Sequence, residues 1–126
     1  MTKSASAFDG DIRDQVVGRR LSSVTFVMDY VRLGLDPPPT ATSINALTPI
    51  TVSSPGGSAA SGDKEFRNLL CDQLLKTVDA ISLLPGNSLT LIFGDGSTVA
   101  ISLREEHYPG PEAINISGGG HFFLVI

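Results

Sequence analysis

Residues 88–102 read SLTLIFGDGSTVAIS, in which apolar and small polar residues alternate on both sides of an Asp-Gly pair. Alternation of this kind is typical of a strand with one buried face, and Asp-Gly between two such runs is a strong signal of a β-hairpin. Leu89 and Leu91 share one face, and Val99 and Ile101 can lie opposite them across the turn. The sequence therefore predicts an antiparallel hairpin here.

The same strand pattern extends outward in both directions. Residues 78–84 form a predicted strand that a Pro-Gly-Asn turn connects to the hairpin. Residues 21–35 are rich in β-branched and aromatic side chains, and a break near Met28-Asp29-Tyr30 divides them into two strands, with Phe26 in the core. Further strands are expected at residues 43–52, 113–117 and 122–126.

One segment has helical instead of strand periodicity. Phe66, Leu69, Leu70 and Leu74 recur at spacings of three, one and four, which predicts an amphipathic helix of about 63–76. The fold class that follows is α+β: a mostly antiparallel β-sheet of about six strands with one main helix packed on it.

The length of 126 residues indicates one domain. Residues 1–17 are expected to be a flexible N-terminal segment with at most a helical turn, which Gly18 ends, and residues 18–126 form a single α+β domain. The Ser- and Gly-rich residues 53–62 are expected to be a flexible connector within that domain.

The two halves of the chain resemble each other weakly. Leu21 and Val24 match Val78 and Ile81, and the alternating residues of 31–35 match those of 89–93 if one residue is added to the first turn. The pattern is consistent with two repeated β-meanders, and it also fits two β-meanders of independent origin.

The composition excludes several classes of partner. The net charge is −4, from 9 Lys and Arg against 13 Asp and Glu, which argues against nucleic-acid binding because phosphate contacts need clustered cations. No apolar run approaches the roughly 20 residues that span a bilayer, so no membrane partner is expected. A single cysteine, Cys71, fits the reducing bacterial cytoplasm.

A resemblance supports this fold. The motif Val-x-Phe-Val-x-Asp-Tyr-Val-x-Leu over residues 24–33 follows Gly18-Arg19-Arg20-Leu21, and Leu47-Thr48, Phe93-x-Asp95-Gly96 and Gly110-Pro111-Glu112-Ala113 come later. With these features the chain resembles a set of small uncharacterised bacterial proteins. The resemblance implies the fold and carries no function that can be transferred.

Three residues are candidates for binding: Asp29, Tyr30 and Glu112. A carboxylate within an apolar run must lie at a turn or find a partner, because burying it alone costs several kcal/mol. Asp29 is therefore either a turn residue that satisfies local amides or part of a polar binding site. Glu112 belongs to an acidic stretch near both histidines of the chain.

His107 and His121 are the candidate metal ligands, with Glu112 between them. Imidazole and carboxylate suit a divalent cation, but the spacing matches no known metal motif, and exposed loop charges explain it equally. Cys71 lies beside Leu70 and Asp72 and is expected to be a buried core thiol. No Gly-x-Ser-x-Gly motif and no phosphate-binding loop occur, so no catalytic residue and no cofactor is assigned.

These observations favour a small non-enzymatic cytoplasmic module that binds a protein partner. One alternative is a toxin-neutralising immunity-type protein, since such proteins are small, acidic and free of catalytic motifs. Another is a metal-dependent hydrolase that uses His107, Glu112 and His121. The apolar strand over residues 122–126 is expected either to be central in the sheet or to pair with a second copy of the chain in a homodimer.

Overall fold

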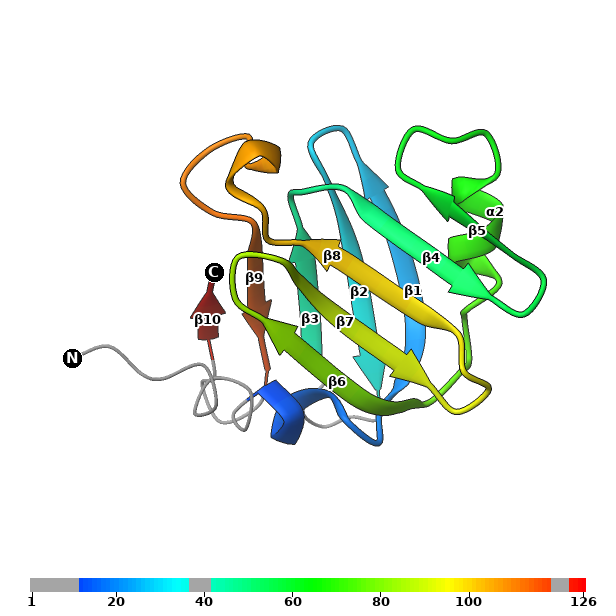
Figure 1. Ribbon diagram of the computed structural model, residues 1–126. Helices are drawn as coiled ribbons and strands as arrows, with labels where there is room; N and C mark the ends of the chain where they lie inside the picture. Colours follow the sequence, from blue (N-terminus) through cyan, green and yellow to red (C-terminus); the bar gives the residue numbers. More distant parts are fainter. Residues whose placement is uncertain (1–11, 37–41, 119–122) are drawn as a thin grey trace.

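The computed structural model describes residues 12–36, 42–118 and 123–126, and they form two five-stranded antiparallel sheets (Figure 1). Sheet A has the order β1 (Arg20–Val27), β2 (Tyr30–Asp36), β3 (Thr42–Ala46), β9 (Ile114–Ser117) and β10 (Phe123–Val125). Sheet B has the order β5 (Gly57–Ala60), β4 (Ile50–Ser54), β8 (Thr98–Ser102), β7 (Ser88–Phe93) and β6 (Val78–Leu84). The two short helices in the described ranges that connect these strands are α2 (Phe66–Cys71) and the 3-10 helix η1 (Glu105–His107).

The antiparallel strands that the sequence predicts are confirmed, but the prediction of one sheet of about six strands is wrong, because the strands form two sheets of five and dominate the fold. The sheets lie one in front of the other in Figure 1 and share one hydrophobic core. Alternate residues of each strand face that core, as a buried sheet face requires. Its fully buried members include Leu33, Leu35, Ile44 and Ile116 from sheet A and Val52, Leu89, Leu91, Val99 and Ile101 from sheet B.

The hairpins predicted from alternation and turn residues are confirmed. β7 and β8 pair with Leu89 opposite Ile101 and Leu91 opposite Val99. The turn between β6 and β7 has Gly86 at φ +74, a left-handed conformation that glycine adopts without the cost of a Cβ clash. β1 and β2 separate at residues 28–29, where the sequence places the break.

The predicted helix over 63–76 is wrong in length, because α2 covers only Phe66–Cys71. Backbone hydrogen bonds to β1 compete with further helical turns: the Leu75 N–H donates to the Leu21 carbonyl at 2.7 Å, and the Leu21 N–H donates to the Lys76 carbonyl at 2.9 Å. Leu75 has φ +74, which ends the helical conformation. The helix packs against β4 and β5 at the edge of sheet B and does not cover a sheet face.

Two segments predicted as one strand and one connector form three strands. Residues 43–52 are divided between β3 and β4, which belong to different sheets, with Pro49 in the connection where a strand would lack a donor. The supposed connector over 53–62 contains the end of β4 and all of β5. Ala59 is buried, and the Ser53 and Ser58 hydroxyls lie 3.2 Å apart across the ladder.

Part of the N-terminal segment belongs to the core. Residues 12–16 are helical, and Ile12 and Val16 are fully buried, so these positions do not behave as a flexible tail. The expected end of this turn at Gly18 is confirmed by its φ of +88. Residues 1–11 lie outside the described residues.

The two β-meanders lie in different sheets. β1-β2-β3 forms one side of sheet A, and β6-β7-β8 forms one side of sheet B. The hairpin that follows each β-meander pairs with the other sheet: β4 pairs with β8, and β9 pairs with β3. Each sheet therefore combines strands from both halves. Duplication of an ancestral half stays a hypothesis, and the pairing of each hairpin with the other sheet is consistent with it.

Within the described ranges, neither the helices nor any other helical stretch is long and apolar enough to cross a membrane.

Candidate functional site

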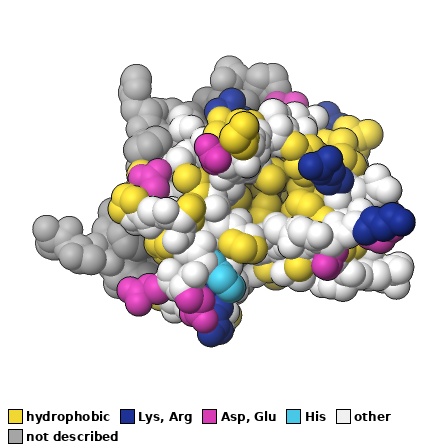
Figure 2. All heavy atoms as spheres, turned by 90° about the horizontal axis from the view of Figure 1, so that it is seen from above, with side chains coloured by type: hydrophobic (Ala, Val, Ile, Leu, Met, Phe, Trp, Pro, Cys, Tyr) yellow, Lys and Arg dark blue, Asp and Glu magenta, His cyan; other side chains and the backbone are white. Residues whose placement is uncertain are grey.

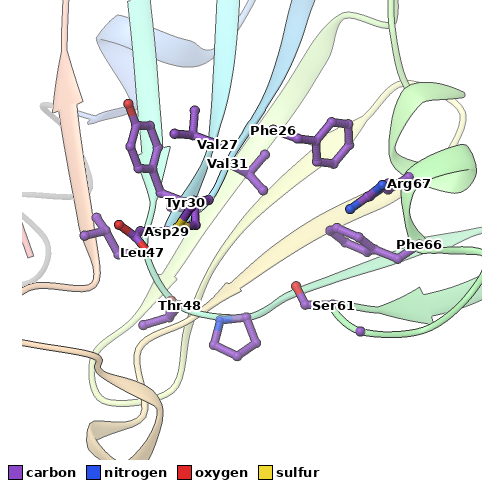
Figure 3. Close-up of a pocket in the computed structure, with 14 residues that line it drawn as sticks. Phe26, Val27, Asp29, Tyr30, Val31, Leu47, Thr48, Ser61, Phe66 and Arg67 are labelled. Carbon is purple, nitrogen blue, oxygen red and sulfur yellow. The ribbon is translucent and has the colours of Figure 1, made fainter.

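An apolar groove opens at one end of the molecule. Its volume is about 350 Å³, and it is bounded by the tip of the β1–β2 hairpin, the β3–β4 connection and the segment from Ser61 to Arg67. Figure 3 shows these side chains around the opening, and Figure 2, which looks down on this end, shows hydrophobic side chains gathered around a hollow. We refer to it as the hairpin groove.

Aromatic rings form one wall of the hairpin groove. Phe26 and Phe66 meet edge to face, with ring centroids 6.5 Å apart and an interplanar angle of 80°. The Arg67 guanidinium carbon lies 5.6 Å from the Phe26 ring centroid, a cation–π arrangement. Phe26 is 39% exposed, so its predicted place in the core is wrong. Its ring contacts Phe66 and Arg67 at the start of α2 and faces the groove.

The hairpin tip adds further exposed apolar surface. Val27 is 42% exposed and Met28 is 96% exposed, and both line the hairpin groove with Phe26. These three consecutive apolar residues at the hairpin tip expose apolar surface that folding of the chain does not bury. A flexible thioether such as that of Met28 adapts readily to the shape of a partner.

The sequence candidates Asp29 and Tyr30 belong to this groove. Asp29 is exposed at the turn between β1 and β2, so the expectation of a turn position is confirmed. Tyr30 is partly buried, and the Arg32 guanidinium carbon lies 5.9 Å from its ring centroid. In Figure 3, Asp29 and Arg67 lie on opposite sides of the opening, so the groove has an acidic side and a basic side.

The third candidate, Glu112, lies elsewhere. A row of hydrogen bonds crosses sheet A from Arg32 Nε to Asn45 Oδ1 at 2.9 Å, and from Asn45 Nδ2 to Asn115 Oδ1 at 2.6 Å. Asn115 Nδ2 then donates to Glu112 Oε1 at 3.3 Å. Glu112 therefore ends a polar row on the sheet and does not line the hairpin groove.

Of the proposed metal ligands, the described residues include His107 and Glu112, and each contacts another side chain. His107 Nδ1 lies 2.6 Å from Ser102 Oγ, and Glu112 is bonded to Asn115. His121 lies outside the described residues, so its part in the prediction is not addressed. Among the described residues, no group of three His, Cys, Asp or Glu side chains could hold a metal ion.

Cys71 is exposed, which corrects the expectation of a buried core thiol. It is the last residue of α2, and Leu70 beside it takes the fully buried position. The end of the helix after Cys71 leaves the thiol facing solvent.

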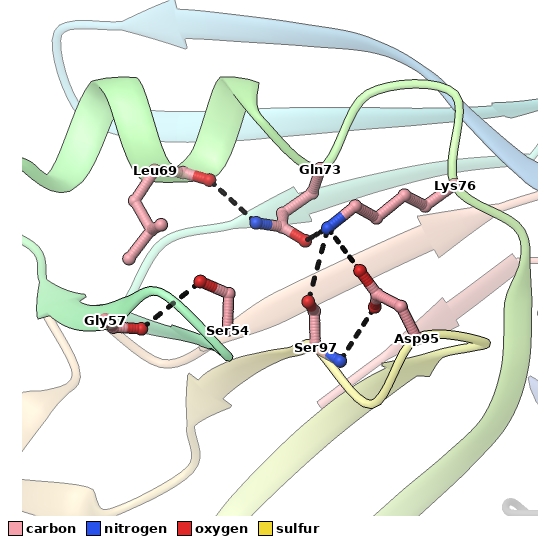
Figure 4. Close-up of polar contacts among 7 residues, drawn as sticks. All are labelled: Ser54, Gly57, Leu69, Gln73, Lys76, Asp95 and Ser97. Carbon is pink, nitrogen blue, oxygen red and sulfur yellow. Dashed lines mark hydrogen bonds and ion pairs between the residues drawn. The ribbon is translucent and has the colours of Figure 1, made fainter.

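A charged network that the sequence did not reveal holds the β7–β8 turn (Figure 4). Lys76 Nζ lies 2.7 Å from Asp95 Oδ2, and it donates to Gln73 Oε1 at 2.8 Å and to Ser97 Oγ at 3.2 Å. The Ser97 N–H donates to Asp95 Oδ1 at 2.9 Å. The hydrogen bond from Lys76, followed by those from Ser97, lowers the pKa of Asp95 from its ordinary 3.8 to about 2. This network connects the segment between α2 and β6 to the turn.

Comparison with known proteins finds no matching family model, no similar curated protein and no similar solved structure. Functional assignment therefore depends on the geometry of the chain itself. The hairpin groove combines exposed apolar side chains, three aromatic rings and opposite charges at its sides. Such surfaces bind other molecules by burying apolar area.

Proposed function

We propose that this protein is a binding module whose hairpin groove captures an extended apolar segment of a partner protein. The observation that carries the proposal is the run Phe26, Val27 and Met28, which exposes apolar surface directly beside a cavity of about 350 Å³. Aromatic residues, Met and Arg are enriched at the centres of protein interfaces, and all three types line this groove.

The open edge of β1 supports an extended partner. β1 is the last strand on its side of sheet A, and β2 is its strand partner. Leu75 and Lys76 occupy only its beginning, through backbone hydrogen bonds to Leu21. Every second N–H and C=O of an antiparallel edge strand points outward, so the part of β1 nearest the groove can pair with an added strand.

Charge selects the partner further. Arg67 lies on the aromatic side of the groove and Asp29 on the other side. We therefore expect a segment that places an acidic side chain against Arg67 and apolar side chains against Phe26 and Phe66. An acidic group beside the exposed Arg67 guanidinium gains a charge-assisted hydrogen bond, which also fixes the direction of the strand.

The test is selection of peptides that bind the full chain from a random library. We expect selected peptides to alternate apolar residues and to carry an acid, and Phe26→Ala to weaken their binding by about tenfold, which equals about 1.4 kcal/mol. The matched control is Leu84→Ala, because Leu84 is an exposed apolar residue, 52% accessible, next to the turn of the β6–β7 hairpin. Equal losses in both variants would contradict the proposal.

Light scattering of the full chain decides between a foreign segment and a second copy. A monomer that binds selected peptides supports the proposal. A dimer that Phe26→Ala dissociates would instead make the groove the homodimer interface, which contradicts a foreign occupant. A toxin-neutralising role would be one case of the proposed binding, with a toxin segment in the groove.

A further inference from the structure

A second cavity, of about 300 Å³, lies on the outer side of sheet B and is distinct from the hairpin groove. Ser102 at the end of β8, Arg104, and His107 in η1 line it together with Asn87 and Ser88 from the β6–β7 hairpin. Its lining contains no carboxylate, although the whole chain is acidic. The cavity therefore combines hydroxyl, imidazole and guanidinium groups.

Ser102 is fixed in this cavity by its backbone and its side chain. Its N–H donates to the Pro49 carbonyl at 3.0 Å, and its own carbonyl accepts from Thr48 Oγ1 at 2.5 Å. Its Oγ accepts a hydrogen bond from the Arg104 N–H at 3.2 Å. Because that bond uses a lone pair, the hydroxyl hydrogen is free to point at another acceptor.

His107 supplies that acceptor. Its Nδ1 lies 2.6 Å from Ser102 Oγ, and η1 holds its backbone through the bond from the His107 N–H to the Arg104 carbonyl at 2.9 Å. In the tautomer that carries its hydrogen on Nε2, Nδ1 accepts the serine hydrogen. A hydroxyl within hydrogen-bond reach of an imidazole is the arrangement of an activated nucleophile.

Arg104 provides positive charge beside this pair. Arg104 lines the same cavity, and its guanidinium forms an ion pair of 3.1 Å with Glu106. A cation in this position favours negative charge that develops on an oxygen next to Ser102. Nucleophile, base and electrophilic group thus come from one segment of six residues, 102–107.

We propose that Ser102 is a nucleophile, activated by His107, that accepts the acyl group of a small ester. Ser102 Oγ attacks the ester carbonyl carbon and forms the new C–O bond, while its proton passes to His107 Nδ1 and the carbonyl oxygen becomes negative beside Arg104. Collapse of this intermediate breaks the bond to the leaving alkoxide, which takes the proton from Nδ1. Water then hydrolyses the acyl-serine, with Nδ1 receiving the proton of the water and returning it to Oγ.

The test treats the full chain with a fluorophosphonate probe and locates the label by mass spectrometry. We expect one label, on Ser102, at a rate that His107→Gln lowers by about a hundredfold, as removal of a general base does. Ser58→Ala is the matched control, since Ser58 is an exposed serine of β5 outside this cavity, and it should leave the rate unchanged.

Hydrolysis of a p-nitrophenyl ester gives the second readout. Ser102→Ala should abolish turnover and keep the thermal unfolding midpoint of the wild-type chain. Labelling of the wild-type chain needs no variant, so absence of a label on Ser102 overturns the proposal directly. A label on Ser102 that His107→Gln leaves unchanged overturns the activation by His107.

Discussion

The β1–β2 and β6–β7 hairpins are equivalent in the fold and differ in chemistry. Each begins the β-meander of its sheet, and each ladder shifts register near its start, between Leu21 and Ser23 in one and between Val78 and Ala80 in the other. The tips differ, since one is the glycine-free Met28-Asp29 and the other is a Pro-Gly-Asn turn. The shared pattern specifies the sheets, and the tip that differs carries the hairpin groove.

Matching core positions of the two hairpins should contribute equally to the free energy of unfolding. Their substitution is the largest effect expected. Leu33 in β2 and Leu91 in β7 match in the internal repeat, and both are fully buried. Leu33→Ala and Leu91→Ala should each lower the free energy of unfolding by about 2–5 kcal/mol, because each leaves a cavity. Urea denaturation measures this, and a loss confined to one variant would break the equivalence.

Substitution at the tip of the β6–β7 hairpin should lower stability more than substitution at the tip of the β1–β2 hairpin. Gly86→Ala should cost about 1–2 kcal/mol of stability, because Gly86 has φ +74 and an L-residue is strained there. Met28→Ala should change stability by less than about 0.5 kcal/mol, since its side chain is 96% exposed. Thermal unfolding compares the two, and a larger loss for Met28→Ala would give that tip a structural role.

A smaller effect is the pH dependence of stability that Asp95 causes in the β7–β8 turn of the second β-meander. Asp95 has a pKa of about 2 in the folded chain against an ordinary 3.8, so its ionised form stabilises the fold above pH 3.8. That contribution is lost as the pH falls from 3.8 through 2. Asp95→Asn should flatten the dependence of the unfolding midpoint on pH in this window.

Lys76→Met provides the partner control for this prediction, because Lys76 is the first cause of the lowered pKa. It should flatten the same window as Asp95→Asn does. An unchanged slope in both variants would mean that the turn network does not stabilise the fold.

Local patterns were sufficient to predict the hairpins and part of the core. Alternation and turn residues act over a few neighbours, so β6, β7 and β8 could be placed from the sequence within a residue or two. Asp29 and Tyr30 likewise identified the hairpin that forms the groove, because an acid within an apolar run needs a turn.

The features that the sequence did not reveal depend on contacts with other parts of the chain. β5 lacks apolar alternation and forms because β4 offers it a partner, and α2 ends early because Leu21 competes for its backbone. Ser102 and His107 are five positions apart, and only the 3-10 turn between them brings their side chains into contact.

Amide hydrogen exchange of the full chain, with and without a selected peptide, tests the central claim most directly. The account predicts slower exchange in residues 23–27 of β1 on binding, because the added strand occupies their outward groups, and no change in β6. Protection in β6, or binding that leaves the exchange of β1 unchanged, would contradict the assignment of the hairpin groove as the binding site.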